Sequence, residues 1–431
     1  MKLSRLVALA SALITLALGG ARVAEAIPIT HVVVVVQENR SVDNLFNGFS
    51  GADTVTQGLN SNGHYTTLTS TTLSSDCDPG HGHNQFVAEA NYNPQTSIWG
   101  MNGFDNETFT GACTANPQSA YVYVNPSYTN TYTYLALHDG GLADEALQMN
   151  SSPSLPAHFW LIGGQAGWPF SVSENMNSGD AGCENTGTTN SVYVQSPYPG
   201  YENFPTTPAC QDFPVIFDLL DTAGVSWKYY INALNPTGLE GLWAPTYGIS
   251  HIQGGPDNAK TVLSSTFFTD VSGHTLPQVS YISPSAANSD HPGSNKLDGT
   301  LGPKWVKSIT DAIGNSAFYW GNTTILIVWD DWGGFYDHVT PRCPTGPYVC
   351  SVSSGFRVPL IAVSPYAKVG YIDHTTRTDG AIMGYIESVF GLGHIGNGVQ
   401  ADAQTDNLVS GMFNYLQAPT SYLTPPTPPP N

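Results

Sequence analysis

Two acidic motifs in this chain each follow directly on an apolar run. Glu38-Asn39 comes after residues 31–37, and Asp330-Asp331 comes after residues 325–329. Uninterrupted β-branched runs of this kind are typical of strands that are buried on both faces in a parallel sheet. Ligands of open α/β sheets collect beyond the carboxyl ends of the strands. The two motifs therefore predict one shared site for a metal ion or a phosphate group.

The residue types in the two motifs suit a divalent cation. Carboxylate and amide oxygens favour calcium, magnesium or manganese, and a histidine ligand would also admit zinc or iron. Two adjacent carboxylates repel each other unless a cation or a proton lies between them. Gly333-Gly334 permits a tight turn, after which Asp337-His338 is expected to return to the same edge. The alternative interpretation is a capped surface turn with no ligand.

Ser154 is the candidate nucleophile. It precedes Leu155-Pro156 and the apolar run 159–162, so we expect it at the N-cap of a helix. There the helix dipole and the free amides would favour an alkoxide or a bound phosphate. The alternative is that Ser154 only caps the helix.

Three histidines outside the second motif could serve the same chemistry. His291 follows an expected strand at 278–282, and His81 and His83 lie in a glycine-rich loop. Imidazoles can contact phosphate oxygens or protonate a leaving group. The alternative for each is a solvated loop side chain.

Helix and strand patterns alternate along the chain. Expected helices lie at 213–223, 303–313 and 379–392, and further expected strands lie at 225–231, 278–282 and 358–363. Alternation predicts an α/β fold with a mostly parallel central sheet flanked by helices. Stretches rich in Gly, Asn, Ser, Thr and Tyr predict long irregular loop or cap insertions around 50–133 and 170–210.

The two ends of the chain are expected to lie outside this fold. Residues 1–26 combine early basic residues, an apolar stretch too short to span a membrane comfortably, and a small-residue cleavage site. They predict a signal peptide and therefore a secreted or periplasmic protein with no transmembrane segment. Residues 27–423 are predicted to form a single domain, and 424–431 a Pro-rich tail.

The charge balance is strongly acidic. The chain has 13 basic and 33 acidic residues, a formal charge of −20 at pH 7. This balance argues against nucleic acid and against anionic membrane surfaces as partners. Charged residues make up only 11% of the chain. A fold that depends little on ion pairs loses little stability when carboxylates protonate, which suggests adaptation to an acidic medium.

Six cysteines in an exported chain predict disulfides, because none has the spacing of a zinc site. The connectivity does not follow from the sequence. The pairings that we expect on local spacing are Cys77–Cys113, Cys183–Cys210 and Cys343–Cys350.

Several segments together resemble the phosphoesterase family that contains bacterial non-haemolytic phospholipases C and secreted acid phosphatases. Between residue 31 and about residue 393 they read ENRSVDNLF, DPGHGH, MNGF, SPSLPAHFWLIGG, SDHP, WDDWGGFYDHV, VPLIAVSPYAKVGYIDH and IESVFGL. The resemblance implies an alkaline phosphatase-like fold and a phosphoseryl intermediate on Ser154. The implied metal ligands are Glu38, Asn39, Ser154, Asp330 and Asp331, and the implied phosphate-contacting or proton-transferring residues are His81, His291 and His338.

Two positions depart from the family pattern. Ala157 stands where an asparagine is common near the nucleophile, so any contact made by that amide is absent. After His374 the chain shows Arg377-Thr378-Asp379 where an Asp-His or similar pair is usual. This second departure could change the wall of the site or the substrate.

The sequence thus predicts a secreted, metal-dependent phosphoric ester hydrolase with a serine nucleophile. An acid phosphatase acting on phosphomonoesters is favoured, and a phospholipase C acting on phosphodiester lipids is the alternative. An alternative from another class is a secreted carbohydrate- or cell-wall-binding protein with a structural calcium site. The metal and the oligomeric state stay open.

Overall fold

The computed structural model describes most of the chain between residues 27 and 429. The gaps lie at 75–76, 94, 107–108, 112–115, 117, 167–170, 175–181, 184–188, 195–205, 209, 235–238, 294–300, 343–353 and 397–400. The predicted signal peptide, residues 1–26, lies outside the described residues. No helix among the described residues is both long enough and apolar enough to cross a membrane.

An eight-stranded sheet forms the centre of the molecule, with strand order β16-β15-β17-β1-β18-β19-β10-β20. Its middle strands β17, β1 and β18 run parallel, and only β19 runs against its neighbours β18 and β10. The strands are β1 (His31–Gln37), β10 (Gly140–Ala143), β15 (Trp227–Ile231), β16 (Thr261–Leu263), β17 (Val279–Ile282), β18 (Thr323–Trp329), β19 (Leu360–Val363) and β20 (Tyr371–Asp373). The predicted α/β fold with a mostly parallel sheet is therefore confirmed.

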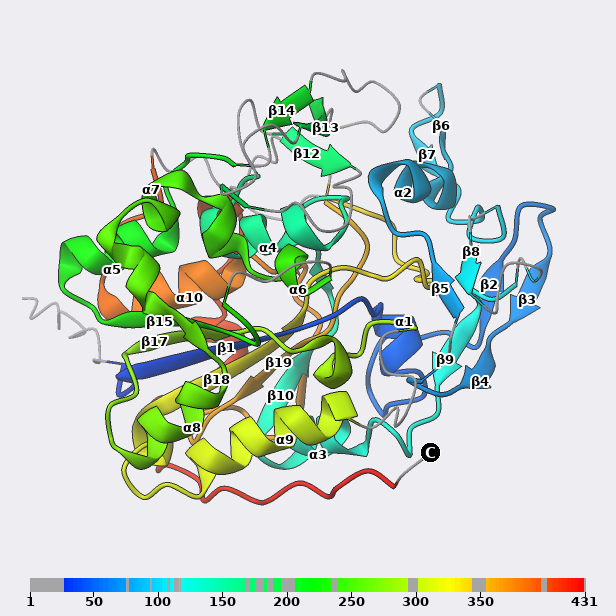
Figure 1. Ribbon diagram of the computed structural model, residues 1–431. Helices are drawn as coiled ribbons and strands as arrows, with labels where there is room; N and C mark the ends of the chain where they lie inside the picture. The colour runs from blue at the N-terminus through cyan, green and yellow to red at the C-terminus, as the bar shows by residue number, and fades with distance from the viewer. Residues whose placement is uncertain are drawn as a thin grey trace, which may run out of the picture.

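Helices cover both faces of this sheet (Figure 1). On one face lie α3 (Asn130–His138), α8 (Ser265–Ser272) and α9 (Leu301–Gly314), and on the other α4 (Ser154–Gly163), α5 (Ile216–Ala223) and α10 (Ala381–Phe390). The expected helices at 213–223, 303–313 and 379–392 correspond to α5, α9 and α10. The apolar runs of β1 and β18 are buried, as predicted, because a helical layer lies against each face.

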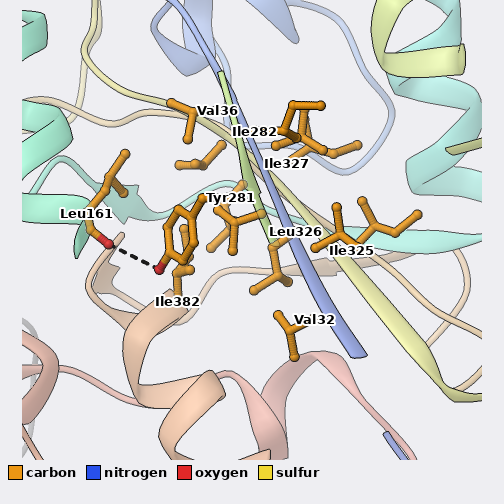
Figure 2. Close-up of a cluster of buried hydrophobic side chains, with 14 of the residues drawn as sticks. Val32, Val36, Leu161, Tyr281, Ile282, Ile325, Leu326, Ile327 and Ile382 are labelled. Atoms are coloured by element: carbon orange, nitrogen blue, oxygen red, sulfur yellow. Dashed lines mark hydrogen bonds between the residues drawn. The ribbon is translucent and has the colours of Figure 1, made fainter. Parts of the chain in front are cut away.

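The buried core joins the sheet to two of the helices that cover it (Figure 2). Val32 of β1, Tyr281 of β17 and Leu326 of β18 pack beside Leu161 of α4 and Ile382 of α10. The Tyr281 hydroxyl donates a hydrogen bond to the Leu161 carbonyl at 3.3 Å. This bond satisfies a hydroxyl that would otherwise be buried without a partner, and it fixes α4 over the sheet.

The insertion at 50–133 contains short strands where we expected irregular loops. Within it, β2 pairs with β3, β4 with β9, β5 with β8 and β6 with β7. A small aromatic core that includes Phe86, Phe104 and Tyr121 packs there against Trp332 and Tyr336 from the second motif. The insertion is thus fastened to the loop that follows β18.

The remaining elements are short. The strands are β2 (Gln57–Leu59), β3 (Tyr65–Thr67), β4 (Thr69–Thr71), β5 (Cys77–Pro79), β6 (Tyr92–Asn93), β7 (Ile98–Trp99), β8 (Phe109–Gly111), β9 (Val122–Val124), β11 (Ala146–Leu147), β12 (Ser171–Glu174), β13 (Thr189–Val194), β14 (Thr206–Pro208) and β21 (Arg377–Thr378). The helices are α1 (Val42–Leu45), α2 (His83–Ala90), α6 (Leu239–Leu242), α7 (Ser250–Gln253), α11 (Val409–Met412), η1 (Pro245–Gly248), η2 (Pro256–Lys260), η3 (Ala286–Asn288), η4 (Trp320–Asn322) and η5 (Ala401–Gln404).

The described disulfide joins Cys183 and Cys210, as predicted. The other two expected pairings involve residues outside those that the structure describes. The Pro-rich tail runs along the α3–α9 face (Figure 1). There Thr131 donates a hydrogen bond to the Pro426 carbonyl at 2.9 Å.

Candidate active site

The two acidic motifs meet beyond the carboxyl ends of β1 and β18. The strands pair in parallel with Gln37 opposite Trp329, so Glu38 and Asp330 leave the sheet side by side. The Asp330 amide donates to the Gln37 carbonyl at 3.0 Å. The backbone amide of Asn39 donates in turn to Asp330 Oδ1 at 3.0 Å. The register of the sheet therefore brings the two motifs together, as the sequence predicted.

Two glycines let the second motif turn tightly around the first. Gly333 and Gly334 both have positive φ, at 66° and 69°. A Cβ on Gly333 would lie 2.3 Å from the Asn39 carbonyl oxygen, and one on Gly334 would lie 2.5 Å from the Gly80 carbonyl oxygen. Only glycine combines this conformation with such close approach. The turn thus packs both the first motif and the His81 loop around the site.

Ser154 enters the site from the start of α4. We expected it at the N-cap, but Pro153 occupies that position and Ser154 is the first helical residue, with no side-chain capping bond. The Ser154 hydroxyl instead lies 3.4 Å from Asn39 Oδ1 and 3.3 Å from Asp331 Oδ2. Its oxygen is therefore directed at the acidic motifs, and the capping interpretation of this serine was wrong.

The acidic residues of the site are completely buried. Glu38, Asp330 and Asp331 have no exposed surface, and their described ion pairs include no lysine or arginine. Burial raises the pKa of Glu38 well above its usual value, and the neighbouring Asp330 and Asp331 raise it further. Burial and Asp330 likewise raise the pKa of Asp331. The cluster has a negative charge that a cation or protons must compensate.

His158 is part of this cluster, although its sequence context predicts only a residue of an apolar helix. Its Nε2 lies 3.0 Å from Glu38 Oε1 and 3.7 Å from Asp330 Oδ2, and the side chain is fully buried. Burial lowers the pKa of His158 to about 4, although Asp330 opposes the shift. A neutral imidazole at neutral pH is the form that can bind a metal. The signal was its position four residues after Ser154, which places both side chains on one face of α4.

Two features indicate that these residues fit a divalent cation. Asp330 Oδ2 is buried and has no hydrogen-bond partner. One atom of the Asn39 side-chain amide lies 3.0 Å from Glu38 Oε2 and 3.2 Å from Asp330 Oδ1. Hydrogen bonding alone favours the amide nitrogen at that position, whereas a cation among these oxygens would favour the amide oxygen. The donor set, mostly oxygen with one imidazole, suits manganese, zinc or iron as well as magnesium or calcium.

His81 borders the same cluster from the insertion. Its Nε2 lies 2.8 Å from the Asn39 amide, and its Nδ1 lies 2.9 Å from the Pro79 carbonyl oxygen. Burial alone would lower the pKa of His81, but the charges of Asp331 and Asp78 outweigh burial and raise it to about 9. The imidazolium form of His81 is therefore favoured beside the acidic residues.

His291 lies edge-to-face against His81, with ring centroids 5.7 Å apart, and both rings line a small cavity. The His291 Nδ1 lies 2.7 Å from the Pro292 carbonyl oxygen, so it carries the proton and Nε2 is the nitrogen available to a substrate. Burial lowers the pKa of His291, and the nearby His81 lowers this pKa further. The negative charge of Asp78 acts in the opposite direction. The cavity has a volume of about 270 Å³. Its lining residues are Gly80, His81, Gly82, Gln85, Pro153, Ser154, Leu155, Pro156, Leu242 and His291.

Buried polar contacts hold the segment that carries His291. The carboxylate of Asp290 accepts hydrogen bonds from Tyr132 at 2.8 Å and from the Trp329 indole at 3.1 Å. The Asp290 carbonyl accepts from Arg40 Nε at 2.9 Å. Arg40 of the first motif thus fixes the backbone beside His291.

His338 lies in a different cluster. Its Nδ1 lies 2.6 Å from Asp43 Oδ2 and its Nε2 lies 3.4 Å from Asp53 Oδ1. It is absent from the lining of the cavity that contains Ser154 and His291. Arg357 balances the acidic residues there through a two-bond contact with Asp337, at 2.9 and 3.1 Å. After the turn at Gly333-Gly334 the chain does return to the first motif, where Ser41 Oγ donates to the Tyr336 carbonyl at 2.8 Å and the His338 amide donates to Asp43 Oδ2 at 2.8 Å. The role of His338 in catalysis stays a prediction.

The two departures from the family pattern have different surroundings. Ala157 is a buried residue of α4, and its methyl side chain can make no polar contact with the site. Arg377 bonds to Asp373 at 2.8 Å and to Asp406 at 2.7 Å, which makes it structural. Asp379 is buried with Oδ1 unpartnered, and burial raises its pKa well above the usual value.

Comparison with known proteins assigns the chain to a family. The phosphoesterase family model matches residues 29–393, most of the chain. The chain therefore belongs to the phosphoesterase family.

Its relatives in this family include phospholipases C. Phospholipase C B of Mycobacterium tuberculosis (strain H37Rv) is 30% identical over 46% of this chain and 43% of its own length. The non-hemolytic phospholipase C of Burkholderia pseudomallei is 28% identical over 40% of this chain and 31% of its own length. The chain thus spans less than half the length of these curated relatives.

A solved structure described as a protein in the alkaline phosphatase superfamily from Vibrio parahaemolyticus also aligns with the chain. It covers 88% of this chain and 69% of its own, with 10% identity and a TM-score of 0.36.

Proposed function

We propose that this chain is a secreted, metal-dependent phosphoric ester hydrolase that acts as an acid phosphatase on phosphomonoesters. One observation carries the proposal. The Ser154 hydroxyl is not used for capping, and it lies 3.3 Å from Asp331 in a cavity that also contains His81 and His291. A serine in this position has a role in nucleophilic catalysis that a binding site would not require.

In this proposal Ser154 Oγ attacks phosphorus in line with the leaving alcohol. The hydroxyl proton passes to Asp331 Oδ2, the oxygen to which Ser154 is hydrogen-bonded. As the bond to the leaving oxygen breaks, protonated His291 donates its Nε2 proton to that oxygen. A phosphoserine and a neutral His291 remain.

The second half of the reaction reverses these roles. Neutral His291 takes a proton from a water molecule that attacks the phosphoserine, and Ser154 leaves with the proton held at Asp331. Inorganic phosphate is released and both residues regain their first protonation states.

The charge on the phosphoryl group is balanced from three directions. The backbone amides of Ser154 and Leu155, in the first turn of the 10-residue helix α4, have no partner within the helix and could donate to phosphate oxygens. His81, which lines the same cavity, contributes a positive charge. A divalent cation held by Glu38, Asn39, Asp330 and Asp331 together with Ser154 would lower the pKa of the serine hydroxyl and attract the phosphate oxygens.

Two observations favour small monoesters at acidic pH. The cavity, at about 270 Å³, suits a phosphate with a compact leaving group. His291 has a lowered pKa, so the protonated form that donates to the leaving group requires acidic conditions. Secretion is proposed from residues 1–26 alone, and N-terminal sequencing of exported protein would test it.

Phospholipase C is the second candidate function. Support for it comes from the names of the curated relatives and from Leu155, Pro156 and Leu242, which give the cavity an apolar side. A carbohydrate- or cell-wall-binding protein with structural calcium is the third possibility, and it leaves the position of Ser154 without a purpose.

The test is hydrolysis of para-nitrophenyl phosphate and para-nitrophenyl phosphorylcholine across acidic to alkaline pH, with and without a chelator. Wild type, Ser154→Ala and Asp330→Asn are compared. We expect turnover of the monoester, fastest in acid, and its loss in both variants and in chelator. Turnover of the choline ester alone would establish phospholipase C instead. Silence on both esters, with cell-wall binding intact in Ser154→Ala, would contradict the hydrolase.

A further inference from the structure

A second group of metal-binding side chains lies far along the chain from the catalytic motifs. Glu387 is near the end of α10, His394 follows in the next loop, and Asp402 lies in η5. One ligand atom from each lies within 4.8 Å of the other two. None of the three lines the cavity that contains Ser154.

The distances in this group are slightly shorter than those between ligands of one small cation. His394 Nδ1 lies 2.9 Å from Glu387 Oε2 and 3.2 Å from Asp402 Oδ2. Ligands on a tetrahedral zinc ion, with bonds of about 2.0–2.2 Å, are about 3.3–3.5 Å apart. Small movements of the side chains would therefore admit such an ion between them.

The second indication is that the two carboxylates are buried with part of their hydrogen-bonding capacity unused. Glu387 and Asp402 are only 4% and 2% exposed. One oxygen of each, Glu387 Oε1 and Asp402 Oδ1, is buried without a hydrogen-bond partner. Buried carboxylates of native proteins are normally paired or bound to a cation.

The described surroundings provide no permanent positive charge for these carboxylates. Their ion pairs among the described residues are with His394, which is charged only when protonated. Arg377, on a neighbouring strand, is engaged by Asp373 and Asp406. Burial raises the pKa of Glu387 to about 9, and Asp402 contributes to the shift. The pair must therefore share either a proton or a cation.

The group is also accessible from solvent. It lines a cavity of about 640 Å³, and His394 is 54% exposed on that side. A cation could enter there and keep water on its open side. The catalytic cluster, in contrast, is completely buried.

We propose that Glu387, His394 and Asp402 form a second divalent-cation site, separate from the catalytic one. One imidazole with two carboxylates favours a borderline metal such as zinc over calcium or magnesium. The cation would bind α10, the loop after it and η5 to one another. Its role is structural, and the proposal does not depend on the catalytic activity.

Zinc chloride alone is the probe, applied by calorimetric titration to metal-stripped, untagged full-length protein. His394→Ala and Asp402→Asn remove ligands, and Ser388→Ala is the control, because Ser388 lines the same cavity without being part of the group. Asp330→Asn removes a proposed ligand of the catalytic site, so that zinc binding at the two sites can be told apart.

We expect wild type and Ser388→Ala to bind zinc at two sites. In His394→Ala one of these sites should be weakened about 100-fold or more, while phosphatase activity is kept. Thermal stabilisation by zinc should shrink in the same variant. Asp330→Asn should retain the site at His394.

The proposal is overturned if His394→Ala binds zinc as wild type does, since the carboxylates would then share a proton. His394 is exposed, so its replacement is not expected to unfold the protein. If circular dichroism shows that Asp402→Asn is unfolded, His394→Ala alone decides the outcome.

Discussion

The two acidic motifs contribute to two neighbouring clusters whose charges are handled in opposite ways. Glu38, Asp330 and Asp331 gather beside Ser154 with no arginine or lysine among their described ion pairs. Asp43 and Asp337, a few residues further along the same motifs, lie against the buried Arg357. Uncompensated buried charge is costly. We propose that it persists in the first cluster because a cation and a phosphate ester bind there, whereas Arg357 already compensates the carboxylates of the second cluster.

Replacing the nucleophile should give the largest effect and should affect the first cluster alone. We expect Ser154→Ala to lower kcat on the order of 10⁴-fold or more, because Ser154 provides the only side-chain hydroxyl among the described residues that line the cavity. Its stability should stay close to that of wild type. The measurement is hydrolysis of para-nitrophenyl phosphate beside a thermal unfolding curve. Ser152→Ala, a buried serine in the same segment, is the matched control and should remain active.

Variants of the two candidate proton donors, His291 and His338, should differ in activity, because each histidine lies in a different cluster. His291→Asn should lower kcat about 10²-fold or more on an alkyl phosphate, whose alkoxide needs a proton to leave. The loss should be much smaller with para-nitrophenyl phosphate, since its leaving group is stable as an anion. His338→Asn should leave both rates near wild type. Equal losses in the two variants would mean that His338 belongs to the catalytic machinery after all.

Arg357→Met, in the second cluster, should lower the stability of the protein and leave its activity unchanged. Removing the guanidinium leaves Asp43 and Asp337 buried without their partner, so we expect a loss of about 3–5 kcal/mol in the free energy of unfolding. The fraction that stays folded should keep its kcat. Urea unfolding followed by fluorescence measures the first quantity, and active-site-normalised rates measure the second. A stable variant with lost activity would reverse the roles that we give to the clusters.

The smallest effect is a pH-dependent one at Asp139, remote from both clusters. Burial raises the pKa of Asp139 to about 7, above its ordinary value of 3.8, with the Leu423 amide opposing the shift. The folded state therefore holds this proton more tightly than the unfolded state does. The contribution of the Asp139 carboxyl to the free energy of unfolding is therefore fully present below pH 3.8, and it is lost as the pH rises to about 7.

Asp139→Asn should consequently stabilise the protein at pH 8, on the order of 2 kcal/mol, and change little at pH 4. Unfolding midpoints at the two pH values check this. The same increment at both would show that the effect is packing and not ionisation. A wild-type midpoint that falls sharply below neutral pH would contradict the proposed adaptation to an acidic medium.

The sheet and the meeting of the motifs were predictable because their signals are local. The apolar runs 31–37 and 325–329 indicate buried parallel strands, and parallel strands end at a shared edge. The choice of Glu38 and Asp330 followed from that geometry alone.

Other features depend on contacts that a single sequence does not reveal. His158 lies in an apolar helix and resembles a core residue until the fold places Glu38 3.0 Å from it. His338 is only seven residues after Asp331, yet its ring pairs with Asp43 and Asp53 and does not line the cavity that contains Ser154. The strands between residues 57 and 124 are two or three residues long, too short to show a periodic pattern.

The central claim is that Ser154 forms a covalent bond to phosphorus. The most direct measurement is to quench wild type during turnover of a phosphomonoester and locate any bound phosphoryl group by peptide mass spectrometry. One half of the sample is quenched in acid and the other in base, so that phosphoserine and phosphohistidine are both preserved. We predict one phosphoryl group on Ser154, found after the acid quench and absent from Ser154→Ala. A phosphoryl group on a histidine, or none on an enzyme that turns over with slow dephosphorylation, would contradict this account.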